Sequence, residues 1–524
     1  MKKFLLVVLS CFCIVQLSAQ ANFKELQEEY AKFGRLLYYI SNHYVDTVNL
    51  HKLVEKMVIT SLHNLDPHSV YISAEDVEAA NEPLQGSFDG IGVEFNIGND
   101  TLTVVNAMSG GPSELVGIRA GDRIITVDKE NIAGIGIKNE RVFKLLRGPK
   151  GTKVELGVRR KDVKELLTFV VTRDKIPIHS VDALYEIQAG IVFVRLNKFA
   201  VNSVDEIRSG LAKLKNPPTA MILDLRSNVG GILPTAIELL DQFFEADKLL
   251  LYTEGAHWSQ APYISTDDGF FKQGKLAILI DEGSASASEI VSGAVQDWDR
   301  GVVIGRRSFG KGLVQQLLHL PDGSDVRLTV ARYHTPTGRA IQRPYDADHL
   351  DLYYSDLYER YSTGEIYNKD SIRFPDSLMY HTLVENRVVY GGGGIMPDVF
   401  IPLDTSYYSA YYAKMMRLGI LNQFCMQYMD KHRAKLKKQY KDFSLFDRQF
   451  EVNDALFNEL VHYAETKDLV KDEAGIQTSQ KHMSRRLKAE FARLLWSTDE
   501  YFQVINKDDE TVAKAIEILQ KDTP

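Results

Sequence analysis

A serine and a lysine stand out in the sequence, because together they could break an amide bond. Ser286 lies in the serine-rich segment 283–289, which follows the apolar run 276–280. Lys311 lies in a turn that follows a second apolar run, 302–305. A serine hydroxyl is a poor nucleophile until a neighbouring base takes its proton, and a neutral lysine can be that base. The pair therefore predicts acyl-transfer chemistry. Three serines, at 284, 286 and 288, compete for the role of nucleophile, and residue types alone do not separate them.

The elements around these residues should bring them to one edge of a sheet. The runs 276–280 and 302–305 have the pattern of strands that are buried on both faces. Between them, apolar residues recur at helical spacing from 286 to 298. A helix of about 12 residues climbs roughly 18 Å, and a strand of about six residues returns roughly 20 Å. Lys311 is therefore expected beside the start of the helix at Ser286.

Lys311 can act as a base only if its pKa lies well below the ordinary value of about 10.4. Burial against apolar residues and a helix N-terminus both disfavour the ammonium form and lower the pKa. Gln315 follows Lys311 at a spacing that puts both on the same face of a strand or a helix. Its amide can accept a hydrogen bond from the amine without adding a negative charge, which would raise the lysine pKa.

A glycine pair offers backbone donors for the same site. From residue 190 onward strand and helix patterns alternate, which predicts an α/β core. The strand 220–226 runs into a turn that contains Gly230 and Gly231. Under the right-handed crossover rule, this turn and the start of the Ser286 helix lie at the same edge of the sheet. The glycine N–H groups could hold a developing oxyanion, or the glycines could serve only the turn from sheet to helix.

Residues 86–173 form a separate glycine-rich unit with short alternating strands. Gly90, Ile91, Gly92 and Val93 lead into one strand, and the segment GIRAGD at 117–122 leads into another. This order of elements resembles a PDZ domain of the bacterial protease type. Successive N–H groups at 90–93 could bind the terminal carboxylate of a peptide, while the adjacent strand pairs with its extended chain.

Several blocks of the sequence, taken together, resemble the carboxyl-terminal processing peptidases, which are also called tail-specific proteases. The resemblance extends over about residues 65–404. Its three signature blocks are DLRSNVGG at 224–231, GSASASE at 283–289 and FGKGLVQ at 309–315, and the segments LDPHS at 65–69 and TPTGRAIQ at 335–342 match in order.

The resemblance implies a crotonase-like (ClpP/crotonase-type) α/β peptidase core with an inserted PDZ domain. It implies that Ser286 is the nucleophile, that Lys311 is the general base and that Gln315 orients the lysine. An oxyanion hole would come from the amides of Ala287 and of one glycine of the pair 230–231. The chain would then be a serine endopeptidase that engages polypeptide substrates by their free C-termini and needs no metal or organic cofactor.

Three other interpretations stay open at this stage. Residues 305–311 match the first seven positions of a phosphate-binding loop, but Gly312 stands where that loop needs a magnesium-binding hydroxyl. His68 or His334 is an alternative base, in a Ser-His-Asp triad. A PDZ-bearing protein with an inactive core would bind C-terminal tails in the cell envelope without cutting them.

Composition and the N-terminus indicate an exported globular protein. The chain is 44% hydrophobic and 25% charged, and a net charge of −8 gives no reason to expect a nucleic-acid partner. Residues 1–21 have the basic start, apolar stretch and Ala-Gln-Ala end that are typical of a secretory signal peptide. An uncleaved anchor and a lipidated Cys11 are the alternatives. We therefore expect a periplasmic or cell-envelope protein that is soluble or loosely associated with the membrane.

The remaining segments complete the predicted organisation. Residues 346–390, rich in tyrosine and acidic side chains, interrupt the core as either a passive insertion or a lid at the substrate rim. The amphipathic helices at both ends of the chain are candidate contacts for a homo-oligomer or an adaptor protein. The predicted domains are a signal peptide at 1–21, an N-terminal helical region at 22–85, a PDZ domain at 86–173, a peptidase core at 174–404 and a helical C-terminal region at 405–524.

Overall fold

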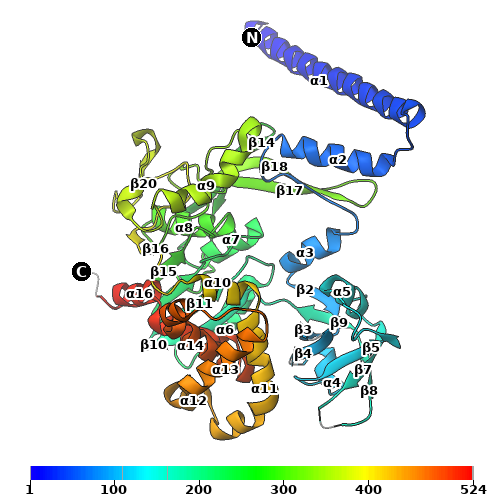
Figure 1. Ribbon diagram of the computed structural model, residues 1–524. Helices are drawn as coiled ribbons and strands as arrows, with labels where there is room; N and C mark the ends of the chain where they lie inside the picture. Colours follow the sequence, from blue (N-terminus) through cyan, green and yellow to red (C-terminus); the bar gives the residue numbers. More distant parts are fainter. Residues whose placement is uncertain (1, 99, 109, 162, 522–524) are drawn as a thin grey trace.

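The computed structural model describes residues 2–98, 100–108, 110–161 and 163–521, with side chains from residue 23 onward. A long N-terminal helix leads into a PDZ-like unit, a central α/β core and a C-terminal helical domain (Figure 1). The PDZ-like unit and the C-terminal domain lie beside each other below the core in Figure 1.

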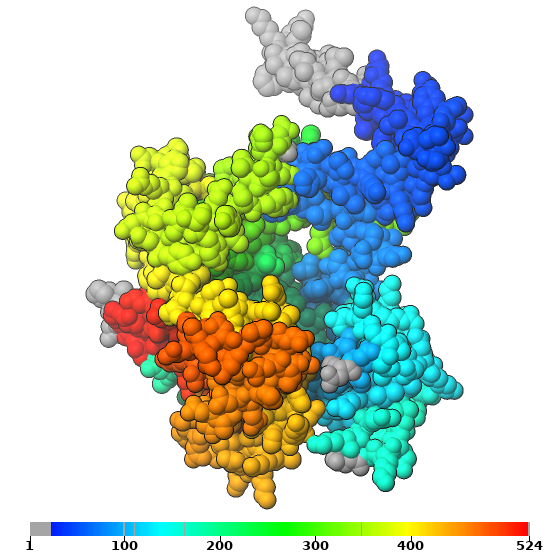
Figure 2. Space-filling view, viewed as in Figure 1, coloured from blue at the N-terminus to red at the C-terminus, as the bar shows by residue number. Residues whose placement is uncertain are grey.

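The N-terminal region consists of three helices and a short strand, α1 (Lys2–His43), α2 (Leu50–His63), β1 (Val70–Ile72) and α3 (Val77–Gln85). The apolar residues Phe23, Leu26, Tyr30 and Phe33 of α1 are exposed, and Figure 2 shows this helix at the periphery of the molecule. The predicted signal peptide, 1–21, falls outside the described side chains. Among the described residues, no helix combines the length and apolar character that a membrane span requires.

The PDZ-like unit is built on an antiparallel sheet with the order β3-β4-β5-β7-β8, and β6 pairs with β5. Strand β3 lies at the edge of this sheet, so one side of its backbone has no strand partner among the residues that the structure describes. The strands β2 and β9 pair with each other where the chain enters and leaves the unit. The elements are β2 (Ser87–Gly90), β3 (Val93–Gly98), β4 (Thr101–Ala107), α4 (Pro112–Leu115), β5 (Arg123–Val127), β6 (Glu130–Asn131), α5 (Asn139–Leu146), β7 (Lys153–Arg159), β8 (Leu167–Thr172) and β9 (Asp174–Pro177).

The central core is a six-stranded sheet with the order β10-β11-β12-β15-β16-β21. Strand β10 pairs antiparallel with β11, and the other pairs are parallel. The strands are β10 (Val181–Gln188), β11 (Ile191–Leu196), β12 (Ala220–Asp224), β15 (Lys275–Ile280), β16 (Val302–Gly305) and β21 (Val399–Phe400). Their continuous apolar runs are explained by helices on both faces of the sheet.

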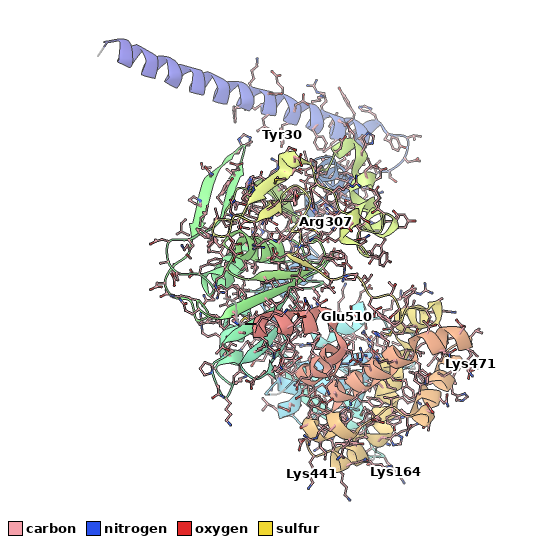
Figure 3. All side chains as sticks on the ribbon, turned by 90° about the vertical axis from the view of Figure 1, so that its left-hand side faces the viewer. Tyr30, Lys164, Arg307, Lys441, Lys471 and Glu510 are labelled. Carbon is pink, nitrogen blue, oxygen red and sulfur yellow. The ribbon has the colours of Figure 1, made fainter. Side chains whose placement is uncertain are left out.

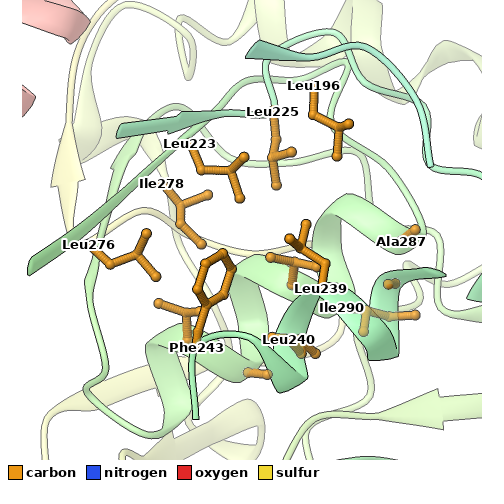
Figure 4. Packing of buried hydrophobic residues seen from close by; sticks show 14 of the residues in the cluster. Leu196, Leu223, Leu225, Leu239, Leu240, Phe243, Leu276, Ile278, Ala287 and Ile290 are labelled. Carbon is orange, nitrogen blue, oxygen red and sulfur yellow. The ribbon is translucent and has the colours of Figure 1, made fainter. Parts of the chain in front are cut away.

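One face of this sheet carries α6 (Ser203–Leu211), α7 (Leu233–Asp241) and α8 (Ala287–Asp297). Figure 4 shows Leu223 and Ile278 of the sheet facing Leu239 and Ile290 of these helices. On the other face, alternate residues of the same strands pack against the C-terminal helix α16 (Glu510–Gln520). The core buries both faces and so holds the carboxyl ends of β12, β15 and β16 in a rigid frame.

A second sheet borders the core and joins the N-terminal region to it. Its order is β1-β18-β13-β14, and β17 pairs with β18. The strands added here are β13 (Leu249–Gly255), β14 (Trp258–Ile264), β17 (Leu313–His319) and β18 (Asp325–His334). Strands β1 and β17 pair with opposite sides of β18, and the turn before β1 contacts β17 through a hydrogen bond from the Gln315 side chain to the backbone oxygen of His68.

The segment predicted as an insertion is folded. It contains η1 (Ala347–His349), α9 (Leu350–Ser362), η2 (Lys369–Ser371), η3 (Asp376–Leu378), β19 (Met379–His381) and β20 (Val388–Tyr390). The strands β19 and β20 form a separate two-stranded sheet.

The C-terminal domain is helical, as the sequence predicts. The amphipathic pattern at 411–429 predicts a single helix there, but this prediction is wrong, because the structure has two helices, α10 (Ala410–Arg417) and α11 (Ile420–Gln439). The chain breaks between α10 and α11 because Gly419 adopts a left-handed conformation with φ 64°. The helices are α10 (Ala410–Arg417), α11 (Ile420–Gln439), α12 (Phe443–Gln449), α13 (Asp454–Glu465), α14 (Glu473–Leu495), α15 (Thr498–Ile505), η4 (Asn506–Asp508) and α16 (Glu510–Gln520).

Candidate active site

Ser286 occupies the sharp turn between strand β15 and helix α8. Its backbone has φ 56° and ψ −112°, which is strained for a residue with a side chain. Such strain persists only where the surroundings impose it, and it is commonly found at functional sites. The turn places Ser286 at the N-terminus of α8, at the carboxyl edge of the central sheet.

The structure distinguishes the three serines of this turn. The hydroxyl of Ser284 donates to the backbone oxygen of Leu225 (2.8 Å), and that of Ser288 donates to the backbone oxygen of Asn228 (2.8 Å). Both side chains are fully buried, so these hydroxyls serve packing. Ser286 is the partly exposed member of the three.

Lys311 lies in the turn between β16 and β17, where the sequence predicts it. Its Nζ donates to Gln315 Oε1 at 3.0 Å. The amide nitrogen of Gln315 in turn donates to the backbone oxygen of His68, in the turn that precedes β1. Among the described residues, no hydrogen bond joins Lys311 Nζ to Ser286 Oγ. Catalytic hydrogen bonds are often long in a free enzyme and tighten when substrate binds.

Two buried side chains tie the backbone of Ser286 to that of Lys311. Oε2 of Glu289 accepts from the N–H groups of both Ser286 (2.8 Å) and Lys311 (2.8 Å). Its Oε1 accepts from Ser308 Oγ (2.6 Å) and from Gly310 N–H (2.6 Å). On another side, the hydroxyl of Tyr333 contacts the backbone oxygens of Ser286 (3.2 Å) and Lys311. Glu289 and Tyr333 therefore hold two segments together that are distant in the sequence.

The electrostatic surroundings lower the pKa of Lys311, although two carboxyl groups oppose this shift. Burial lowers the pKa of Lys311, and the positive charge of Arg327 acts in the same direction. The carboxyl groups of Glu289 and Asp66 act in the opposite direction. Burial also raises the pKa of Glu289, although its four hydrogen bonds counter that rise.

The glycine turn lies directly against the serine. A Cβ added to Gly230 would lie 2.9 Å from Ser286 Cβ and 3.0 Å from Ala287 N, so only glycine fits there. The N–H of Gly230 donates to Asn228 Oδ1 (2.9 Å). The N–H groups of Ala287 and Gly231 have no hydrogen-bond partner within the described chain. Of the two glycines, Gly231 therefore has the N–H that is free for a substrate oxygen.

The predicted carboxylate-binding residues lie together at the entry to β3. Gly92 has φ 70°, and the carbonyls of Ile91 and Gly92 accept bonds from Ser113 N–H (3.1 Å) and Met108 N–H (3.0 Å). Within the described residues, the N–H groups of Ile91 and Gly92 have no hydrogen-bond partner. They are available to an anion beside the open edge of β3.

The structure does not support the rival sites. A phosphate-binding loop needs a helix after its lysine, but strand β17 follows Lys311. His334 bonds to the backbone oxygen of Gly338 (3.2 Å) and pairs with Glu254 (3.2 Å). Nε2 of His68 is bonded to the hydroxyl of Tyr353 (2.7 Å). Neither histidine forms a hydrogen bond with Ser286 in the described structure.

Sequence reasoning missed three contributors, namely Glu289, Tyr333 and the His68 carbonyl. Glu289 carries a weak signal, because a glutamate three residues after an N-cap serine is typical of a capping box. For the Tyr333 hydroxyl and the His68 backbone oxygen the sequence has no such signal, since their contacts depend on how the second sheet packs against the core.

Comparisons with known proteins agree with this architecture. Residues 190–348 match the model of peptidase family S41, residues 103–160 match a PDZ domain, and residues 411–497 match a family of unknown function, DUF8443. A carboxy-terminal-processing protease of Bartonella bacilliformis is 34% identical over 327 residues, which cover 61% of this chain and 74% of that protein. The carboxy-terminal processing protease CtpB of Bacillus subtilis is 32% identical over 333 residues, with coverage of 63% and 68%.

One solved structure in the comparison is the photosystem II D1 C-terminal processing protease. Its alignment covers 71% of this chain and 86% of that protein's chain, at 25% identity and a TM-score of 0.35. The sequence matches confirm the resemblance drawn from the signature blocks. The chain belongs to the carboxy-terminal-processing proteases of peptidase family S41 and is a serine-type peptidase with a PDZ domain.

Proposed function

We propose that this peptidase cleaves polypeptides near their free C-termini by means of a Ser286–Lys311 dyad and a covalent acyl-enzyme. One observation carries the proposal. The backbones of Ser286 and Lys311 are joined twice, by the carboxylate of Glu289 and the hydroxyl of Tyr333. The lysine amine is buried and donates to Gln315, and burial lowers its pKa.

In the proposed reaction, neutral Lys311 takes the proton of Ser286 Oγ as this oxygen attacks the substrate carbonyl carbon. The N–H groups of Ala287 and Gly231 stabilise the oxyanion that forms. The C–N bond then breaks, and the Lys311 ammonium gives its proton to the leaving amine. A water molecule attacks the acyl carbon while Lys311 takes one of its protons, and the ester bond breaks as the Lys311 ammonium gives that proton to Ser286 Oγ. Gln315 keeps the amine in place throughout.

The PDZ domain would select the substrate by its tail. The N–H groups at Ile91 and Gly92 would bind the terminal carboxylate, with Gly90 and Val93 completing the turn. The open edge of β3 would pair with the residues that precede the carboxylate.

The fold and location are part of the proposal. A sheet with parallel central strands, helices on both faces and the serine at its carboxyl edge supports a crotonase-like core. The signal-peptide pattern at 1–21 supports action in the periplasm or cell envelope.

The test is cleavage of an unfolded polypeptide with a free C-terminus, followed by intact mass. Ser286→Ala and Lys311→Ala should each lower the rate by about 10⁴-fold or more, because serine and base act as a unit. Ser362→Ala, at an exposed serine, is the control and should keep the wild-type rate. Circular dichroism should show all variants folded. Cleavage by Ser286→Ala at the wild-type rate would contradict the dyad. Tail binding by a wild-type protein that does not cleave would favour the binding-only interpretation.

A further inference from the structure

The insertion contacts the segment that carries Lys311. In helix α9, Arg360 is 3% exposed, and its guanidinium donates to the backbone oxygens of Ser308 (2.7 Å) and Phe309 (3.2 Å). Asp356, one turn earlier, pairs with Arg360 Nε (2.9 Å). Arg307, labelled in Figure 3, pairs with Glu365 just beyond α9. The loop that leads to Lys311 is thus held from the insertion side.

A second contact reaches the other side of the lysine. Tyr353, 4% exposed on α9, lies 2.7 Å from His68 Nε2 through its hydroxyl. Burial, with a contribution from the charge of Lys311, lowers the pKa of His68 to about 4, so its ring is neutral near pH 7. The Tyr353 hydroxyl and Nε2 of the neutral ring share one hydrogen bond, and the tautomer of the ring decides which of the two donates. The backbone oxygen of His68 accepts from Gln315, which accepts from Lys311.

Stacked side chains connect the Arg360 contact with the Tyr353 contact. The guanidinium of Arg343 lies 4.2 Å from the ring centre of Phe309 and 3.8 Å from that of Tyr353. The ring of His68 meets the ring of Tyr353 edge-on at 5.4 Å. Cation–π and edge-to-face contacts of this kind add stability beyond simple burial.

We propose that the insertion is a brace for the catalytic base, and that Tyr353 is a positioning residue for Lys311. The proposal rests on the Ser286–Lys311 dyad and adds a role for residues 346–390. A passive insertion would leave the active-site loop independent of α9, and a lid would need exposed, separable contacts. The observed contacts are buried. They connect α9 to Lys311 in two ways, through the loop that precedes the lysine and through Gln315, which follows it.

The brace should act on rate rather than on substrate affinity. Without the Tyr353 hydroxyl, the His68 turn and Gln315 lose a fixed partner, and the lysine amine becomes more hydrated. Hydration favours the ammonium form, so the pKa of Lys311 should rise and less of the lysine should be neutral at pH 7. Glu289, Arg327, Asp66 and His68 also face the amine and are unchanged in the variant.

The experiment compares Tyr353→Phe with Tyr358→Phe, whose side chain on the same helix is 75% exposed. For Tyr353→Phe we expect kcat to fall about tenfold, as for loss of one buried hydrogen bond, while KM stays within about twofold. The midpoint of the rising limb of kcat against pH should move to higher pH. Tyr358→Phe should match the wild type in all three quantities.

A second variant distinguishes loss of this hydrogen bond from a general loss of stability. His68→Ala removes the other partner of the same bond, so the double variant should be no slower than the slower single variant. A wild-type kcat and pH midpoint for Tyr353→Phe would overturn the brace. So would a lower melting temperature with an unchanged midpoint, or losses that multiply in the double variant. If Ser286→Ala and Lys311→Ala remain active, the proposed dyad is wrong. Failure of the dyad is thus distinguishable from failure of the brace.

Discussion

Glu289 is the residue on which the geometry of the site depends most directly. Its two carboxyl oxygens accept from donors that belong to two separate segments, the serine turn and the lysine loop. A buried carboxylate is stable only when it is hydrogen-bonded in this way, because burial otherwise disfavours its charge. The same charge raises the pKa of the lysine, so this site combines precise positioning with a base that is less readily neutral.

The proposed dyad makes the reaction depend on pH through the protonation of Lys311. Only its neutral form can take the serine proton, so kcat should rise with pH through the lysine pKa, which burial lowers. A pH–rate profile from pH 6 to 10 measures this, provided that stability is followed in parallel. The unfolded chain binds this proton more tightly than the folded chain, so the contribution of Lys311 to stability also increases with pH. A rate that falls between pH 6 and 8 would contradict Lys311 as base.

At the scale of elements, the PDZ strand β3 and its glycine turn are the proposed recognition unit, and they lie in a different sheet from the strands that flank Ser286 and Lys311. Edge strands bind extended peptides through backbone hydrogen bonds, and a carboxylate adds a charge that only a chain end supplies. Packing of the turn depends on Gly92, because an added Cβ would lie 3.1 Å from Ile176 Cδ1 and 3.3 Å from Pro112 Cδ.

Substrates that differ only at the terminal carboxyl group test this element. Conversion of the C-terminal acid into an amide should lower kcat/KM by about tenfold or more, since a charge-assisted hydrogen bond is lost. The measurement is a competition between acid and amide forms of one peptide. Gly92→Val, which crowds the turn, should bring the two forms to similar rates. Equal rates for acid and amide with the wild-type protein would show that the PDZ domain does not read the carboxylate.

At the scale of the whole molecule, the C-terminal domain is attached to both other units. It contacts the PDZ-like unit through Arg493 and Glu94 (3.0 Å) and through Lys161 Nζ and the backbone oxygen of Asp430 (3.1 Å). These contacts are exposed and should be weak. Its attachment to the core is stronger, because Asp509 pairs with the largely buried Arg226 (2.8 Å).

Asp509 tests that attachment. Its side chain also caps α16 by accepting from Val512 N–H (3.0 Å). Asp509→Ala should therefore lower the free energy of unfolding by about 1–3 kcal/mol, from the lost cap and ion pair. Glu510→Ala, at an exposed position of the same helix start (labelled in Figure 3), should cost less than about 0.5 kcal/mol. Urea unfolding measures both. Equal losses would contradict a specific role for the Arg226–Asp509 pair.

The sequence by itself predicted the alternation of strands and helices in the central core and the edge of the sheet where Ser286 and Lys311 lie. Apolar runs and crossover handedness are local or general properties, so they placed the Gly230 turn, Ser286 and Lys311 on the same edge. Family blocks identified the peptidase and its PDZ domain.

Only the tertiary structure decided which serine has an unburied side chain, which glycine N–H is free, and what holds the lysine. Ser284 and Ser288 differ from Ser286 because their hydroxyls donate to backbone oxygens in the turn after β12. The bond between Tyr353 and His68 joins residues 285 positions apart. No sequence pattern encodes such a contact, because it depends on how the second sheet and the insertion pack against the core.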